Sequence, residues 1–141
     1  VAKAGHVSSV PVTSSDLYPT CLVASGLPEH PAQHRDGLDL RSVLEGEESL
    51  EREALFWHYP HYNRHPSSLP SSVIREGDWK LIETFDPAGF ELYNLKEDLG
   101  ETTDLGKDNP QKLAELKAKL EEWREEVDAE MMEPNPDFIG R

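Results

Sequence analysis

The chain has 141 residues, enough for one modest domain with a core, and it carries 14 Lys and Arg against 28 Asp and Glu. The net charge of −14 argues against a general nucleic-acid binder, which needs a positive face, and against docking on an anionic membrane surface. No apolar run approaches the ~20 residues of a membrane-spanning helix, and the single cysteine excludes an intramolecular disulfide.

The negative charge is distributed unevenly along the chain. Residues 1–75 have a net charge of −3, whereas residues 76–141 have a net charge of −11. The 22 residues from Ala54 to Arg75 contain no Asp or Glu. An acid-free stretch in an acidic chain is one place where an anion could approach without repulsion.

The first fifty residues predict two short helices. One begins at Asp16, an acid well placed at the positive end of a helix dipole, and is ended by Gly26 and Pro28. The second is capped by Asp39 and ends at Gly46.

Cys21 lies on the first of these helices. It shares one apolar face with Leu17 and Ala24. A catalytic thiolate would need exposure and a cationic neighbour. Cys21 is therefore interpreted as a small buried hydrophobe and not as a nucleophile.

After residue 53 the pattern changes to short strands separated by turns. The turns are predicted at Glu76-Gly77-Asp78 and at Asp86-Pro87-Ala88-Gly89. Such closely spaced strands predict an antiparallel meander. The expected strands are Ala54–Tyr59, Ser71–Arg75, Trp79–Thr84 and Phe90–Asn94.

The last predicted element is a long amphipathic helix. Asn109 can cap it, Pro110 suits its first position, and the apolar periodicity continues to about Met131. Because the stripe spans fewer than three heptads, we expect it to pack on the sheet and not in a coiled coil. The stripe consists of Leu113, Leu116, Leu120, Trp123, Val127 and Met131.

These elements indicate an α+β fold, in which a small antiparallel sheet of about four strands packs with a long C-terminal helix and follows a helical segment. No nucleophile elbow and no glycine-rich phosphate loop is present in the sequence. Composition and spacing alone therefore predict a module without a self-contained active site.

The densest group of potential ligands is His58, His61 and His65. Two prolines break this segment, so helical geometry cannot align the three rings, and no acid lies nearby in sequence to orient them. Three interpretations stay open: a transition-metal site, a loop that presents imidazoles and Arg64 to an anionic substrate, and an ordinary surface loop.

The order of motifs resembles the C-terminal part of the type I sulfatases, the arylsulfatase-like enzymes of the alkaline-phosphatase superfamily. The resemblance extends from Ala4 to about Val127. The matching pieces, in chain order, are Ala4-Gly5-His6-Val7, Pro11-Val12, Ser15-Asp16-Leu17-Tyr18-Pro19-Thr20, Ala24-Ser25-Gly26-Leu27-Pro28, Asp36-Gly37 with Leu40, Val43-Leu44-Glu45-Gly46, Ala54-Leu55-Phe56-Trp57-His58-Tyr59-Pro60-His61-Tyr62, Ile74-Arg75-Glu76-Gly77-Asp78-Trp79-Lys80-Leu81-Ile82, Glu91-Leu92-Tyr93-Asn94-Leu95 and Gly100-Glu101.

The resemblance implies that the chemistry resides upstream of this chain. The family nucleophile is a formylglycine made in a C-x-P-S-R motif, and a calcium ion and basic side chains neutralise the sulfate. Cys21 is followed by Leu22-Val23-Ala24, so it does not match that motif, and the Asp/Asn cluster that holds calcium is absent from the sequence. We expect no catalytic residue, metal or cofactor in this chain, with calcium and formylglycine in an N-terminal domain.

The resemblance also implies how the chain is divided. Residues 1–50 are expected to be the last piece of the catalytic domain, and residues 51–141 the C-terminal subdomain, a small antiparallel sheet with a helix packed on it. Asp16, Trp79 and Lys80 recur in the family, and a structural role is expected for each. Exposed residues of 1–50, such as Leu17 and Leu22, are expected to pack on the upstream domain or to favour self-association.

In the family, loops of the C-terminal subdomain border the substrate pocket. The alternative for this segment is that Trp57, Tyr59 and Tyr62 simply pack the edge of the subdomain. The positions expected to bind substrate are His58, His61, Tyr62 and Arg64.

The resulting functional hypothesis is the C-terminal region of a sulfatase that acts on aryl or carbohydrate sulfate esters and is not catalytic alone. Its partners would be the upstream catalytic domain and a sulfated small molecule or glycan, and a secreted, periplasmic or lysosomal location is what the family implies. The alternative is a free-standing module that binds anionic sugars through the histidine-rich loop of residues 58–65.

Overall fold

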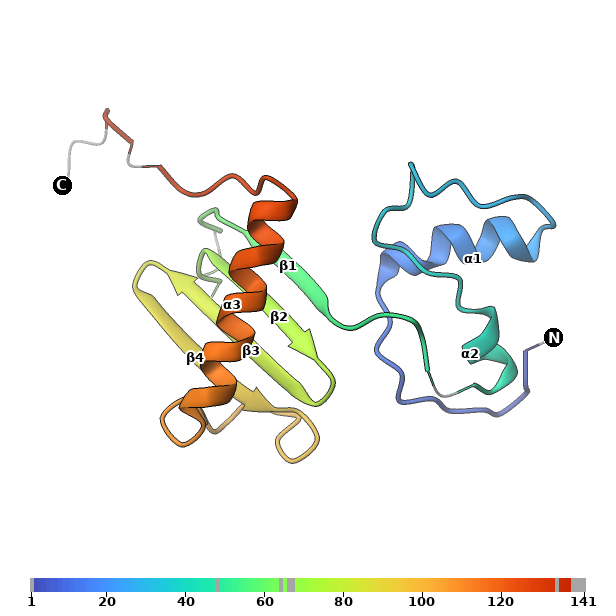
Figure 1. Ribbon diagram of the computed structural model, residues 1–141, viewed down its shortest axis with the longest axis horizontal. Coiled ribbons are helices and arrows are strands. Elements are labelled where there is room, and N and C mark those ends of the chain that lie inside the picture. Colours follow the sequence, from blue (N-terminus) through green and yellow to red (C-terminus); the bar gives the residue numbers. More distant parts are fainter. Residues whose placement is uncertain (1, 48, 64, 66–67, 134, 138–141) are drawn as a thin grey trace. The chain divides into compact units, whose positions relative to one another are not determined.

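The computed structural model describes residues 2–47, 49–63, 65, 68–133 and 135–137, and the chain divides into two compact units (Figure 1). Unit 1 is Val1–Arg52 and unit 2 is Glu53–Arg141. The division falls just beyond the boundary expected between residues 50 and 51. That unit 1 belongs to a catalytic domain stays a prediction.

Unit 1 contains a 3-10 turn, η1 (Ser14–Asp16), followed by the helices α1 (Leu17–Ala24) and α2 (Arg41–Glu45). Both helices end at the predicted glycines. Gly26 and Gly46 adopt left-handed conformations, with φ of 76° and 108°. The amide after each glycine donates back to the helix, as in a Schellman motif.

Asp16 is the central polar residue of unit 1, and its side chain is fully buried. Its carboxylate accepts hydrogen bonds from the amides of Thr13 at 2.8 Å and Leu38 at 2.9 Å, and from both terminal nitrogens of Arg52. Burial alone would raise the pKa of Asp16, but the hydrogen bonds from Arg52 and the two amides outweigh it, and the pKa lies below its usual value. The expected structural role of Asp16 is therefore visible in its contacts.

Gly37 allows the loop before α2 to approach η1 closely. A Cβ atom at this position would lie 2.3 Å from the carbonyl oxygen of Ser15, which no real contact tolerates. The next residue, Leu38, donates its amide to Asp16. Glycine at position 37 is thus what brings that amide within reach of the buried carboxylate.

The predicted burial of Cys21 is wrong, because the structure exposes this side chain. Leu17, on the same face of α1, is 58% exposed, and the fully buried residue of the helix is Pro19. Seven of the eight residues of α1 are largely apolar, so the sequence contains no polar face that would mark the solvent side. Both Leu17 and Leu22 are expected to be exposed. Leu17 is exposed as expected, whereas Leu22 is half-buried.

Unit 2 contains a four-stranded antiparallel sheet in the order β1-β2-β3-β4, which confirms the predicted meander. The turn between the last two strands is shorter than expected because Phe85 already pairs with Ala88. The strands are β1 (Leu55–Tyr59), β2 (Ser71–Glu76), β3 (Trp79–Phe85) and β4 (Ala88–Asn94).

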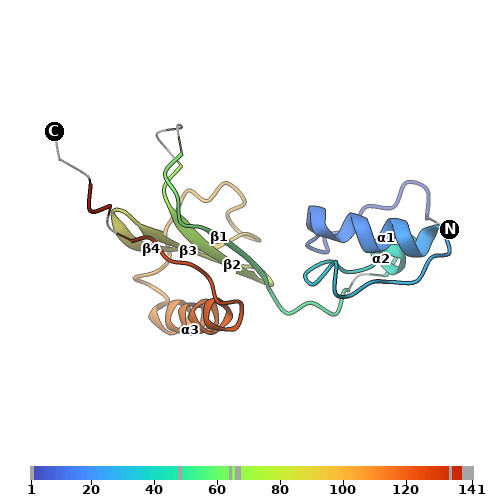
Figure 2. The ribbon, with the colours of Figure 1, turned by 90° about the horizontal axis from the view of Figure 1, so that it is seen from above.

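The helix α3 (Pro110–Glu126) covers one face of this sheet (Figure 2). Phe56 of β1 stacks on Trp123 of α3, with ring centroids 4.8 Å apart. Ile74, Leu81 and Leu92 are paired across adjacent strands, so their side chains meet the same face of the helix. The fully buried core consists of Ile74, Leu81, Leu92, Leu116 and Leu120.

Ionic contacts fix α3 on the sheet beside the apolar core. Glu76 of β2 accepts from Lys112 at 3.2 Å and also from Lys119. Arg124 donates to Glu83 of β3 at 2.5 Å. Lys80, on the opposite face of β3, pairs with Glu101 at 2.7 Å, a structural contact as expected for Lys80.

The helix α3 is shorter than predicted, because it ends at Glu126 and not near Met131. Trp123 still has a partner on the sheet, but Val127 is 48% exposed and Met131 is 49% exposed. Asp128 takes a left-handed conformation with φ of 52°, and the chain leaves the helical path there. No helix among the described residues has the length and apolar character needed to cross a membrane.

Candidate functional site

The predicted site residues lie at the end of β1 and in the loop that follows it. His58 is on the strand, whereas His61 and Tyr62 are exposed residues of the loop between β1 and β2. Arg64 lies outside the described residues, so its predicted role stays a prediction. The structure thus places two of the four predicted residues together on an accessible loop.

His58 faces the same side of the sheet as the core, and both of its ring nitrogens have protein partners. Nε2 lies 2.8 Å from the carbonyl oxygen of Glu130, and Nδ1 lies 2.7 Å from Oγ of Ser72. A carbonyl oxygen only accepts, so Nε2 donates to Glu130, and Nδ1 shares a hydrogen bond with the hydroxyl of Ser72. His58 therefore holds the segment after α3 against the sheet.

This contact belongs to a longer chain of hydrogen bonds. Arg124 donates to Oγ of Ser72 at 3.3 Å and also to Glu83. Because Ser72 is in turn bonded to His58, a continuous series of hydrogen bonds connects Glu83 with His58. The four side chains come from four different elements, β3, α3, β2 and β1. The chain of bonds ends at Glu130, where it fixes the position of the C-terminal segment.

The two loop residues have different surroundings. The ring of His61 lies edge-on to Tyr59, with centroids 5.5 Å apart. The hydroxyl of Tyr62 donates to Asp86 at 2.5 Å, and this hydrogen bond raises the pKa of Tyr62, so the phenol is neutral at pH 7. Tyr62 is thereby oriented toward the turn between β3 and β4.

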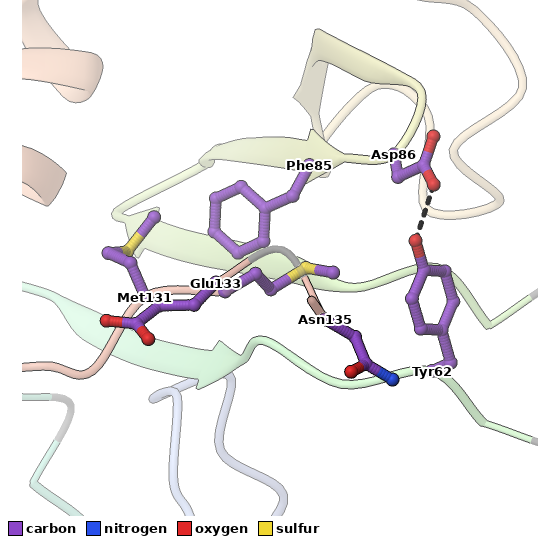
Figure 3. Close-up of a pocket in the computed structure, with 7 residues that line it drawn as sticks. Tyr62, Phe85, Asp86, Met131, Glu133 and Asn135 are labelled. Carbon is purple, nitrogen blue, oxygen red and sulfur yellow. Dashed lines mark hydrogen bonds between the residues drawn. The ribbon is translucent and has the colours of Figure 1, made fainter. Parts of the chain in front are cut away.

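A cavity of about 840 Å³ opens beside the Tyr62–Asp86 hydrogen bond (Figure 3). Phe85 lies at its apolar side, and the ring of His58 contacts the ring of Phe85 edge-on, with centroids 5.9 Å apart. The segment that His58 holds through Glu130 forms the other wall. The lining residues are Tyr62, Phe85, Asp86, Met131, Met132, Glu133 and Asn135.

The acid-free stretch in the sequence is not acid-free in space. Asp86 contacts Tyr62 directly, and Glu133 lines the same cavity. The fold brings these acids from the β3–β4 turn and from the C-terminal segment. The expectation that an anion meets no repulsion along residues 54–75 is therefore wrong beside Tyr62.

His58, His61 and His65 do not come together as metal ligands. Among the residues that the structure describes, no three His, Cys, Asp or Glu side chains are arranged to hold a metal ion. The two ring nitrogens of His58 are occupied by Ser72 and Glu130. The metal-site interpretation of this histidine group thus has no geometric support.

Sequence reasoning missed the residues that complete the cavity. The turn containing Asp86 was recognisable only as a turn, and Glu133 and Asn135 belong to a segment without helical or strand pattern. In the sequence, Met131 belongs to the apolar stripe of the predicted C-terminal helix. No local signal links these positions to Tyr62, because they lie at least 24 residues away along the chain.

The family match and the curated relatives of this chain agree with one another. Residues 2–129 match the family described as N-sulphoglucosamine sulphohydrolase, C-terminal. A sulfatase of Formosa agariphila is 40% identical over 119 residues, which cover 77% of this chain and 21% of that protein. An N-acetylglucosamine-6-O-sulfatase of Bacteroides thetaiotaomicron is 34% identical over 130 residues, covering 88% of this chain and 23% of that protein.

The fold agrees with these relatives. The solved structure of a 2-O GAG sulfatase superposes with a TM-score of 0.67 at 25% identity, over 81% of this chain and 25% of that one. This chain therefore spans between a fifth and a quarter of the length of these proteins. The family match agrees with the order of motifs, the four-stranded meander and the covering helix. The chain belongs to the N-sulphoglucosamine sulphohydrolase C-terminal family, a family of sulfatase C-terminal regions.

Proposed function

We propose that this chain serves as the C-terminal part of a sulfuric ester hydrolase and borders the pocket that receives a sulfated sugar. The observation that carries the proposal is the family match over residues 2–129, together with relatives that are named as sugar sulfatases. The matched segment is about a fifth of those enzymes. Its contribution is to complete the fold and the edge of the pocket.

The reacting groups of such an enzyme would come from the upstream catalytic domain. In the proposed enzyme a formylglycine hydrate would supply the nucleophile and calcium would neutralise the sulfate. Cys21 lacks the following Pro-Ser-Arg, and no cluster of acids suited to a metal exists among the described residues. The residues of this chain do not fit either group, so we assign them binding and positioning roles only.

His61 and Tyr62 are the residues that we assign to substrate contact. Both are exposed on the β1–β2 loop. The imidazole of His61 can donate to a sulfate oxygen or to a sugar hydroxyl, whereas the Tyr62 hydroxyl, whose proton goes to Asp86, can accept from a sugar hydroxyl. Arg64, two residues further on, would add a cation suited to the sulfate or to a carboxylate. His58 is assigned to hold the adjoining wall, since its nitrogens are already engaged.

The partner proposed for this chain is the upstream domain of the same enzyme. The sheet face opposite α3 presents Trp57, 44% exposed, and Tyr59, 47% exposed. Exposed aromatic surface of this kind favours a partner surface that offers apolar side chains.

The test uses the protein with its upstream region, compared with the 141-residue chain alone, on an aryl sulfate and on a sulfated glucosamine in the presence of calcium. The complete protein is expected to turn over both esters, and the chain alone neither. His61→Ala should raise KM about tenfold with little change in kcat, as expected for a group that binds substrate and transition state equally. His30→Ala, an exposed histidine of unit 1, is the matched control.

Two results would contradict the proposal. Turnover by the 141-residue chain alone would show that it contains its own reacting groups. Unchanged KM in His61→Ala and in Tyr62→Phe would remove the β1–β2 loop from the substrate pocket. Tyr18→Phe controls for the second variant because it removes a hydroxyl, which donates to Gln33, from an exposed position of α1.

A further inference from the structure

The cavity beside the Tyr62–Asp86 hydrogen bond is a formed space within unit 2 and has a definite chemical character (Figure 3). Its apolar part consists of the ring of Phe85 and the side chains of Met131 and Met132. Its polar part consists of the side chains of Tyr62, Asp86, Glu133 and Asn135. A volume of about 840 Å³ is in the range of small-molecule sites.

The charge of the cavity decides what can enter it. Two carboxylates, Asp86 and Glu133, line the cavity, and none of the lining residues that the structure describes is Lys, Arg or His. The guanidinium of Arg124 lies over the ring of Phe85, 5.9 Å from its centroid, but its charge is already paired with Glu83. The whole chain carries −14 as well. A sulfate or carboxylate group would therefore be repelled, whereas hydroxyl and ammonium groups could donate hydrogen bonds to both acids.

We propose that this cavity is a subsite for a sugar ring that carries neither sulfate nor carboxylate. The inference rests on the proposed function, in which the neighbouring loop receives a sulfated sugar, and it assigns the next, unsulfated ring of the chain to this cavity. The aromatic face of Phe85 suits the apolar face of a pyranose, and the carboxylates of Asp86 and Glu133 accept from its hydroxyls. Tyr62, shared by loop and cavity, marks the junction of the two sites.

The wall of this subsite is held in place by the sheet. Met131 and Met132 directly follow Glu130, whose carbonyl oxygen accepts from His58. The same ring contacts Phe85 edge-on. One histidine thus positions both the apolar platform and the opposite wall, although it does not face the cavity as a ligand itself.

The composition of the chain offers a local probe for the experiment. It contains two methionines, and both line the cavity. With methyl-13C-methionine, the two methyl resonances report on this site alone. We would titrate the 141-residue chain with an N-acetylglucosamine disaccharide and, separately, with the same disaccharide bearing a 6-sulfate on each ring, so that neither ring can enter the cavity without its sulfate.

The expected result is a saturable shift of both methyl resonances by the unsulfated disaccharide, with binding about tenfold tighter than that of the sulfated one. In Asp86→Asn combined with Glu133→Gln, this preference should narrow to about threefold or less, because the repelling charges are gone. Glu122→Gln, an exposed acid of α3, is the matched control and should keep the full preference. An unchanged thermal transition of tryptophan fluorescence in each variant establishes that unit 2 is folded, since all three tryptophans lie in this unit.

Two outcomes would overturn the proposal. One is the absence of any methyl shift at about 50 mM unsulfated disaccharide, and the other is equal or tighter binding of the sulfated sugar by the unmodified chain. Neither outcome bears on turnover by the complete protein. A failure of this subsite is therefore distinguishable from a failure of the proposed sulfatase function.

Discussion

The Nε2 atom of His58 lies 2.8 Å from the carbonyl oxygen of Glu130, so the first strand of the sheet holds the segment that follows α3. Glu130 belongs to a stretch without helix or strand, and such a stretch needs a specific contact to stay in place. The ring that provides this contact is itself fixed by Ser72. The position of the C-terminal segment therefore depends on a histidine 72 residues earlier in the chain.

Replacing His58 by alanine should release this segment while the sheet stays folded. We expect a loss of stability of about 1 kcal/mol, the net value of an ordinary hydrogen bond, and faster amide exchange in residues 129–133. Hydrogen exchange followed by mass spectrometry measures the effect. His61→Ala is the control, because His61 is exposed and has no part in holding Glu130, and equal exchange in both variants would contradict the assignment.

Asp16→Asn should destabilise unit 1 strongly. The substitution removes the charge that faces Arg52 in a buried pair and costs on the order of 3 kcal/mol. All three tryptophans lie in unit 2, so tryptophan fluorescence follows that unit alone. We expect faster exchange of the Thr13 and Leu38 amides, the donors to Asp16, with an unchanged fluorescence transition.

The control for Asp16 is Asp39→Asn. Asp39 pairs with Arg41 at 2.7 Å on the surface, where an ion pair contributes roughly 1 kcal/mol or less. An effect of Asp39→Asn as large as that of Asp16→Asn would refute the central role of Asp16. A shift of the tryptophan transition by Asp16→Asn would show that the two units unfold together.

The strands and the long helix could be predicted from sequence because their signals are local. Alternation between Phe56 and His58 on one face and Trp57 on the other is visible within a few residues, and the stripe from Leu113 to Trp123 repeats within one helix. The end of α3 could not be read in this way. The stripe continues in sequence past the point where the sheet offers a partner, and only packing decides where the helix stops.

The candidate site was predicted in part, and its missing half is non-local. His61 and Tyr62 stand out in sequence, but the partner of Tyr62 is Asp86, 24 residues away. His58 resembled a free ligand because nothing nearby in sequence engages it, whereas its partners are Ser72 and Glu130. The expectation of a surface without acids, drawn from counting charges along the chain, is wrong for the same reason. The fold brings Asp86 and Glu133 to Tyr62 from distant segments.

Leu81→Ala should show how much of the stability of unit 2 depends on its core. Leu81 is fully buried between β2, β4 and α3, and truncating such a leucine costs roughly 2–5 kcal/mol. Thermal unfolding followed by tryptophan fluorescence should therefore shift down by about 10 °C or more. Leu99→Ala makes the same chemical change at a residue that is 82% exposed and should leave the transition nearly unchanged.

Glu76→Gln tests the ionic attachment of α3 through its pH dependence. Burial alone would raise the pKa of Glu76, but the hydrogen bonds from Lys119 and Lys112 outweigh it and hold the pKa below its ordinary value of 4.5. A lowered pKa in the folded state means that the ionised carboxylate stabilises the fold. This contribution is complete above pH 4.5 and is lost as the pH falls through the lowered pKa.

At pH 7 we therefore expect Glu76→Gln to lower the free energy of unfolding by about 1 kcal/mol, as measured by urea denaturation. Near pH 3 the difference from the unmodified chain should shrink, because a protonated glutamate and a glutamine are then both neutral. Glu121→Gln provides the control, since its pair with Lys117 spans 3.7 Å and is solvent-exposed. A stability difference for Glu76→Gln that stays constant between pH 7 and pH 3 would mean that its carboxylate charge does not attach the helix.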